Sequence, residues 1–175
     1  MIHILRTWLR PYTAPIALVM ALLLVQAIAT GNSPYLAWPS PPPTSGNPFA
    51  DCLGVINDAA EFALWLSPHI LTNTSRVLMA VVGTPKDEAQ DYEDVLVEMA
   101  EAAGGGVTDP PRTVSDCRDH EDNLILDLAA EVGALLVVSE DADLTSMSPW
   151  RGVPILRAAQ FVARVDAMRR QRRRT

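Results

Sequence analysis

Two pairs of aspartates have the residue type and spacing best suited to chemistry. Asp119 and Asp122 are expected to open a helix, and Asp141 and Asp143 to follow the carboxyl end of a buried strand. In an open parallel sheet, both places face the crevice where ligands bind. Carboxylates that converge there repel one another unless a cation joins them. Mg²⁺ or Mn²⁺ takes oxygen ligands and can activate a water to attack a phosphodiester, so the aspartates indicate a metal site.

The same spacings also fit a purely structural role. Asp119 and Asp122 have the spacing of a capping box at the start of a helix. Asp141 and Asp143 favour a turn and could cap the next short helix. Spacing alone leaves both interpretations open.

The elements that must position these aspartates follow an α/β pattern. Continuous apolar runs predict that Leu135 to Val138 is a fully buried parallel strand, in one sheet with Glu61 to Leu66 and with helices on both faces. A last short strand is expected over Gly152 to Leu156. Helices are expected from Asn47 or Pro48 through Ile56, from Ser67-Pro68 to Gly83, from Thr84-Pro85 to Gly104, from Asp119 to Gly133 and from Ala158 to Arg170. The Gly104 to Gly106 run follows a helix and is predicted to be a linker rather than a phosphate-binding loop.

Three segments in the final third of the chain carry a family resemblance. They run from Cys117 to Ala129 (CRDHEDNLILDLA), from Leu136 to Leu144 (LVVSEDADL) and from Gly152 to Leu156 (GVPIL). In order, spacing and residue type they resemble the PIN-domain family, and the nearest branch looks like the ribonuclease toxins of toxin–antitoxin pairs. The resemblance covers roughly residues 32–170.

The resemblance implies a fold, a chemistry and a set of partners. The fold would be a single α/β domain with a central parallel sheet flanked by helices. The activity would be that of an endoribonuclease dependent on Mg²⁺ or Mn²⁺, with Asp122 and Asp141 as catalytic and metal-binding acids and Asp119 and Asp143 as supporting metal ligands. The partners would be single-stranded RNA and an antitoxin protein, and a homodimer is a further expectation.

Two positions depart from the family pattern and predict a degenerate site. The helix that starts at Ser67-Pro68 carries Asn73 where the family has an acid, and an amide binds a cation more weakly than a carboxylate does. The aspartate that ends the family's first strand falls at about Val19, and no carboxylate precedes Asp51. We therefore expect weak metal binding and reduced or absent cleavage.

The amino-terminal segment, residues 1–31, has several interpretations. Ile16 to Val19 could be a degenerate first strand, followed by a helix over Ala21 to Thr30. Alternatively, Ala14 to Ala29 carries no charge and follows Arg6 and Arg10, which is typical of a membrane anchor. A short stretch, residues 5–30, resembles the first membrane helix of an ABC multidrug exporter. A cytoplasmic location is the first expectation, and a membrane-anchored one is the alternative.

Composition sets outer limits on these interpretations. The length of 175 residues suits one domain, expected over residues 32–168 with a basic tail over 169–175. The formal net charge of −7 argues against a protein that coats nucleic acid over its whole surface. Two cysteines, Cys52 and Cys117, are too few for a disulfide framework and are expected to be buried thiols.

The function expected from sequence is a PIN-type metal-dependent endoribonuclease with weakened or lost activity, acting as the toxin half of a toxin–antitoxin pair. A catalytically inert PIN-like module that binds RNA or an antitoxin protein is the alternative from another class. A membrane-tethered PIN-like domain is the third. The missing acids favour the inert module, whereas the remaining acids favour residual metal binding.

Overall fold

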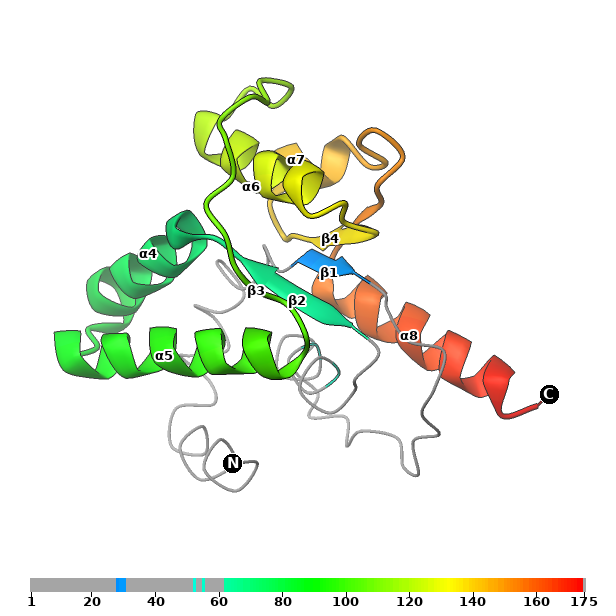
Figure 1. The fold of residues 1–175 in the computed structure, drawn as a ribbon, viewed down its shortest axis with the longest axis horizontal. Helices are drawn as coiled ribbons and strands as arrows, with labels where there is room; N and C mark the ends of the chain where they lie inside the picture. The colour runs from blue at the N-terminus through cyan, green and yellow to red at the C-terminus, as the bar shows by residue number, and fades with distance from the viewer. Residues whose placement is uncertain (1–27, 31–51, 53–54, 56–61, 175) are drawn as a thin grey trace.

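The computed structural model describes residues 28–30, 52, 55 and 62–174. This part of the chain is an α/β arrangement in which helices cover both faces of one sheet (Figure 1). Its strands are β1 (Ile28–Thr30), β2 (Ala63–Leu66), β3 (Gly106–Val107), β4 (Leu136–Val138) and β5 (Ile155–Leu156). Its helices are α4 (Pro68–Val77), the π-helix η2 (Leu78–Val82), α5 (Lys86–Ala102), α6 (His120–Glu131), α7 (Ala142–Ser146) and α8 (Ala158–Arg172). The α/β class expected from sequence is confirmed.

The sheet has the strand order β3-β2-β1-β4-β5. The pair β4–β5 is parallel, as expected, and so is the pair formed by β2 with the unexpected strand β3, whereas β1 is antiparallel to both β2 and β4. The expectation of a central parallel sheet flanked by helices is therefore confirmed for the strands on either side of β1, and β1 itself is the exception. Because β2 and β4 both oppose β1, they point the same way, and their carboxyl ends meet at one edge of the sheet.

The amino-terminal segment meets the described residues at β1. The helix expected over Ala21 to Thr30 is wrong at its end, because Ile28–Thr30 is a strand that fills the slot between β2 and β4. Ile16 to Val19, the expected first strand, lies outside the described residues, and so does most of the segment considered as a membrane anchor. Within the part of the chain that the structure describes, no helix is long and apolar enough to cross a membrane.

The first helical unit follows β2 without a loop. Ser67 caps α4, because its hydroxyl accepts a hydrogen bond from the amide of Ile70 at 3.4 Å and Pro68 stands at the first helical position. The helix continues as η2 and stops at Gly83, whose φ of 78° is a left-handed conformation that glycine adopts without strain. Helix α5 then returns along the sheet. The boundaries expected from the Ser-Pro and Thr-Pro pairs are confirmed.

The chain between α5 and β4 differs from the prediction at two points. Gly106 was expected to belong to a linker but begins the edge strand β3, which pairs with Trp65 and Leu66 of β2. At Gly105, an added Cβ would lie 1.9 Å from the carbonyl oxygen of Leu64, so only glycine permits this approach of the backbones. Strand β4 is shorter than expected, since Leu135 lies outside it and is 58% exposed.

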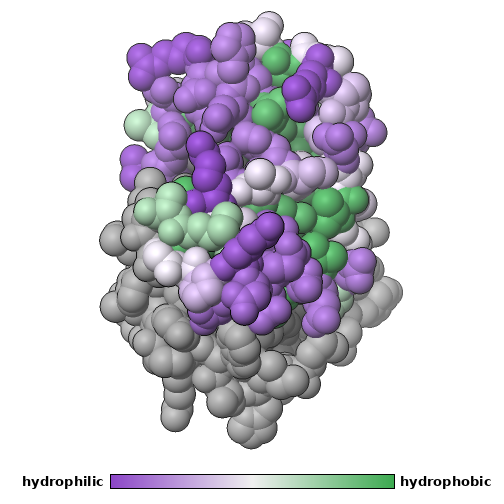
Figure 2. Space-filling view, turned by 90° about the vertical axis from the view of Figure 1, so that its left-hand side faces the viewer, coloured by the Kyte–Doolittle hydropathy of each residue, from purple (hydrophilic) through white to green (hydrophobic). Residues whose placement is uncertain are grey.

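The core lies between the sheet and the two helical layers. In Figure 1, α6 and α7 lie on one side of the sheet, and α5 and α8 on the other. Phe62, just before β2, meets Phe161 of α8 edge to face with ring centroids 5.3 Å apart. Cys52 and Cys117 are free and buried, as expected. Viewed from the side on which α4 and α5 lie, the described surface is largely hydrophilic with smaller apolar patches (Figure 2).

A buried aspartate holds the segment before α6 in place. Asp127 on α6 accepts hydrogen bonds through Oδ1 from the amides of Thr113 and Val114, each at 2.8 Å, and from the Thr113 hydroxyl at 3.1 Å. Its side chain is 3% exposed. Hydrogen bonds to a buried charged acceptor are stronger than neutral ones, so this contact fixes the approach of the chain to the start of α6.

Replacing this aspartate is expected to destabilise the fold. Asp127→Ala leaves two amide donors without their acceptor, which should lower the free energy of unfolding by about 3 kcal/mol in urea denaturation. Asp91→Ala removes an exposed carboxylate from α5 and serves as the matched control, with little expected change. An equal loss in both variants would contradict the role assigned to Asp127.

Candidate metal centre

Three carboxylates converge where α6 begins and where the chain leaves β4. Asp122 lies in the first turn of α6, Asp141 caps α7, and Asp143 lies in the first turn of α7. One carboxylate oxygen from each lies within 4.8 Å of the others. The structure thus brings together both expected catalytic acids and one of the two expected supporting acids.

The fourth expected acid, Asp119, has a different role. It caps α6, accepting a hydrogen bond from the amide of Glu121 at 2.8 Å, and its side chain is exposed. Asp141 is also a cap, since its Oδ1 accepts from the amide of Asp143 at 2.7 Å. The structural interpretation of the aspartate spacing is therefore correct for both caps, and at Asp141 a cap and a metal-site position coincide.

Asp122 has the least favourable surroundings for a charge. Its side chain is 5% exposed, and burial, followed by the negative charge of Asp141, raises its pKa to about 6. The thiol of Cys117 lies 3.5 Å from Asp122 Oδ2 and donates to it, which acts in the opposite direction. Among the described residues, no cationic side chain forms an ion pair with Asp122 that would balance its charge.

Asp143 already has such a cation. Arg118 contacts it through both ends of the guanidinium group, at 2.9 Å from Nε to Oδ2 and 2.7 Å from a terminal nitrogen to Oδ1. Sequence reasoning missed Arg118, although it stands directly before the cap of α6. Because its side chain is 83% exposed, the pair is open to solvent and contributes little to stability.

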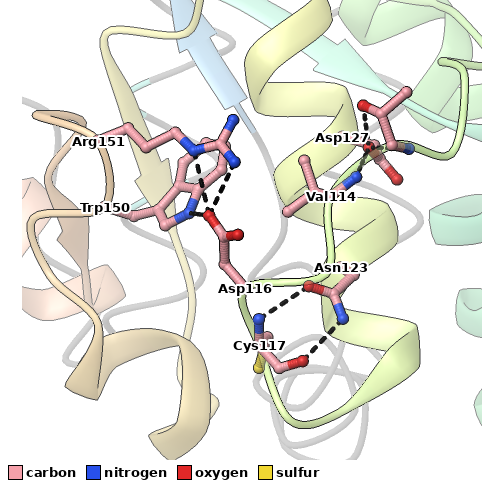
Figure 3. Close-up of polar contacts among 8 residues, drawn as sticks. Val114, Asp116, Cys117, Asn123, Asp127, Trp150 and Arg151 are labelled. Atoms are coloured by element: carbon pink, nitrogen blue, oxygen red, sulfur yellow. Dashed lines mark hydrogen bonds and ion pairs between the residues drawn. The ribbon is translucent and has the colours of Figure 1, made fainter.

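The segment before α6 is anchored at several further points (Figure 3). Asn123 accepts from the amide of Cys117 at 2.9 Å and donates to the carbonyl oxygens of Cys117 and Asp119 at 2.8 and 3.0 Å. Asp116 accepts from Trp150 Nε1 at 2.8 Å and from Arg151 Nε at 3.1 Å. These contacts tie the segment both to α6 and to the turn before β5. Sequence reasoning missed Asn123 and Asp116 because their partners are set by tertiary structure.

The degenerate family position on α4 is engaged by its own helix. Asn73 Oδ1 accepts from Arg76 at 2.8 Å, and Arg76 reaches Glu121 of α6 at 3.8 Å. Because Arg76 can only donate, it orients the amide so that Asn73 Nδ2 donates to His69 Nε2 at 3.1 Å. Helix α4 therefore offers no carboxylate at this position. The other degenerate position, Val19, lies outside the described residues.

The donor set suits a hard divalent cation. Three carboxylates supply oxygen ligands, and one guanidinium offsets a single one of their charges. The edge on which they lie is also where the carboxyl ends of β2 and β4 meet, the usual place for ligands in such sheets. The arrangement has the oxygen ligands that could hold one divalent metal ion.

Comparison with known proteins gives one match. Residues 46–143 match the family model described as PIN domain, which spans more than half of the chain and includes all three acids of the cluster. No protein of curated function and no solved structure matches the chain.

Without a metal ion, the charge of Asp122 should cost stability in a pH-dependent way. Its folded pKa of about 6 exceeds the ordinary value of 3.8, so its contribution to stability is present below about pH 4 and is lost as pH rises through 6. In EDTA, Asp122→Asn should therefore unfold at a higher temperature than the wild type at pH 8, with the gap closing toward pH 4. The control Asp91→Asn should track the wild type. A variant that is less stable than the wild type at pH 8 would contradict the assigned electrostatics.

Proposed function

The chain belongs to the PIN-domain family, a nuclease-type family, and we propose that it is a metal-dependent endoribonuclease of single-stranded RNA with weakened activity. The observation that carries the proposal is the convergence of Asp122, Asp141 and Asp143 within 4.8 Å. The motif resemblance adds the toxin half of a toxin–antitoxin pair as its proposed role, with an antitoxin protein as its partner.

The chain's own residues would bind and orient in this reaction. Asp122 and Asp141 would hold a bound Mg²⁺ or Mn²⁺, and Arg118 keeps Asp143 beside them. The ion would supply an activated water and charge stabilisation at the phosphate. Ser139, which is fully buried, accepts from the amide of Asp141 at 3.1 Å and so fixes the start of the turn that carries two of the acids.

Weak activity follows from the charge of the site. Mg²⁺ gives up its hydration shell reluctantly, and each anionic ligand helps to offset that cost. Among the described residues, the cluster holds three carboxylates, of which one is already paired with Arg118, while α4 contributes the neutral Asn73. A site with this charge should bind the ion less tightly than one with additional acids.

The alternative from another class is an inert PIN-like module that binds RNA or an antitoxin protein. The uncharged Asn73, already occupied by His69 and Arg76, favours this alternative. The two functions differ in one measurable respect. Only the enzyme requires the divalent ion for an effect on RNA.

Cleavage of a labelled single-stranded RNA tests the proposal. The wild type should cleave slowly with Mn²⁺ and not with EDTA, and Asp141→Asn should lower the rate roughly 100-fold, or about 2.7 kcal/mol in activation free energy. Mn²⁺ should also raise the unfolding temperature of the wild type but not of the variant. Asp91→Asn is the control for a lost carboxylate outside the site. RNA binding without metal-dependent cleavage would favour the inert module instead.

Restoring a charge on α4 tests why the site is weak. Asn73→Glu should increase Mn²⁺ affinity about tenfold, or about 1.4 kcal/mol, because a further anionic ligand or near neighbour joins the cluster. Asn73→Gln introduces a side chain as long as that of Glu but without its charge, and it should leave the affinity for Mn²⁺ unchanged. Equal affinities for Glu and Gln, measured by titration calorimetry, would mean that Arg76 neutralises the new carboxylate or that α4 lies too far from the ion.

A further inference from the structure

A cavity of about 270 Å³ lies against α6, the helix that also carries Asp122, and is not used by the chemistry proposed for the acidic cluster. Its walls come from the start of α4, from the loop after β3 and from α6. Among the residues that line it are Pro68, His69, Thr72, Asp109, Arg112 and Leu124. Its volume suits a small organic group such as one nucleotide rather than a folded partner.

The cavity and the cluster share the first turns of α6. Glu121, which reaches Arg76 of α4, and Leu124 are three residues apart and so lie on one face of the helix. Asp122 projects from nearly the opposite side of the helix to Leu124, because two residues turn a helix by about 200°, and it meets Asp141. The two sites are therefore separated by about the width of a helix, on the order of 10 Å. An RNA strand that occupies both places must cross this distance.

The walls of the cavity combine three kinds of surface. Pro68 and Leu124 are apolar, and His69 adds a flat ring. That ring is neutral, since burial lowers its pKa against the opposing charge of Glu121, and its Nε2 accepts from Asn73. Arg112 is exposed and makes no ion pair within the described part of the chain. Asp109 is exposed as well and places a carboxylate on the same rim.

We propose that this cavity binds one ribonucleotide of the RNA strand next to the scissile phosphodiester, with Arg112 contacting a phosphate and Asp109 accepting a hydrogen bond from a ribose 2′-hydroxyl. Unpaired bases are recognised by stacking on flat or apolar side chains, and guanidinium groups match phosphate oxygens. A carboxylate that accepts from the 2′-hydroxyl favours RNA over DNA, because DNA lacks that donor and leaves only charge repulsion. This inference rests on the proposed function and adds a basis for substrate choice.

Binding measured without cleavage tests the cavity on its own. A fluorescein-labelled oligoribonucleotide and the matching oligodeoxyribonucleotide are titrated with the full chain carrying Asp141→Asn, and anisotropy is recorded. Adding Arg112→Ala should weaken binding of both about tenfold, which is about 1.4 kcal/mol. Adding Asp109→Ala should weaken RNA binding alone and remove the preference for RNA. Arg164→Ala, an exposed arginine on α8, is the matched control for lost positive charge and should have little effect.

Two further measurements separate this proposal from the nuclease assignment. With Asp141 intact, the cavity variants should retain the Mn²⁺ affinity and unfolding temperature of the wild type, since neither residue belongs to the cluster. RNA binding that depends on Arg112, together with no metal-dependent cleavage by the chain that retains Asp141, would support the cavity while refuting the nuclease. Metal-dependent cleavage with unchanged KM in both cavity variants would do the reverse. Losses no larger than that of Arg164→Ala would also overturn the cavity proposal.

Discussion

Three carboxylates within 4.8 Å of one another repel, and the rest of the domain must hold them together against that repulsion. The restraint comes from two sides. Strand β4, paired with β5, delivers Asp141 and Asp143 through a turn fixed by the buried Ser139. Helix α6 positions Asp122. The side chains of Asp127 and Asn123 hold the segment before that helix in place through hydrogen bonds to its backbone. Burial, and after it the negative charge of Asp141, raises the pKa of Asp122, which shows that holding this carboxylate in place still costs free energy. The positions of these acids are thus set by the hydrogen bonds around them and by the Arg118–Asp143 pair rather than by attraction between the acids.

Much of the fold followed from local sequence signals. Ser67-Pro68, Thr84-Pro85 and Asp119 marked helix starts that the structure confirms, because capping depends on a few neighbouring residues. The apolar run around Val137 predicted the strand next to β1, because a strand that is buried on both faces needs consecutive apolar residues. Neither β1 nor its direction was predicted, since three residues carry no periodic pattern and a short strand has no local feature that distinguishes parallel from antiparallel neighbours. Strand β3 was missed because Gly106 and Val107 pair with a distant segment, and pairing of that kind leaves no periodic pattern in two residues.

The candidate site was predictable in its acids but not in its supports. Family-like spacing placed Asp122 and Asp141 together, and the structure agrees. It did not separate Asp143, which joins the cluster, from Asp119, which turns away to cap α6, because both stand at helix starts with similar neighbours. Arg118, Asn123 and Asp116 were missed, since each acts on a partner whose position depends on how the segment before α6 folds back on the domain. In the sequence, charged and amide residues of this kind cannot be distinguished from ordinary surface residues until their hydrogen-bond or ion-pair partners are known.

The fastening of α6 in its first two turns has a consequence for how the chain can vary in evolution. Asn123 secures its first turn and Asp127 its second, each to a fixed backbone segment, while Asp122 faces the cluster. One residue inserted or deleted between these anchors would rotate one anchor relative to the other by about 100° and shift it along the helix axis by about 1.5 Å. No single substitution could correct such an offset. Relatives of this chain should therefore keep the number of residues between these anchors, even where the buried Ile125 and Leu126 are replaced by other apolar residues, and length changes should collect outside the anchored stretch.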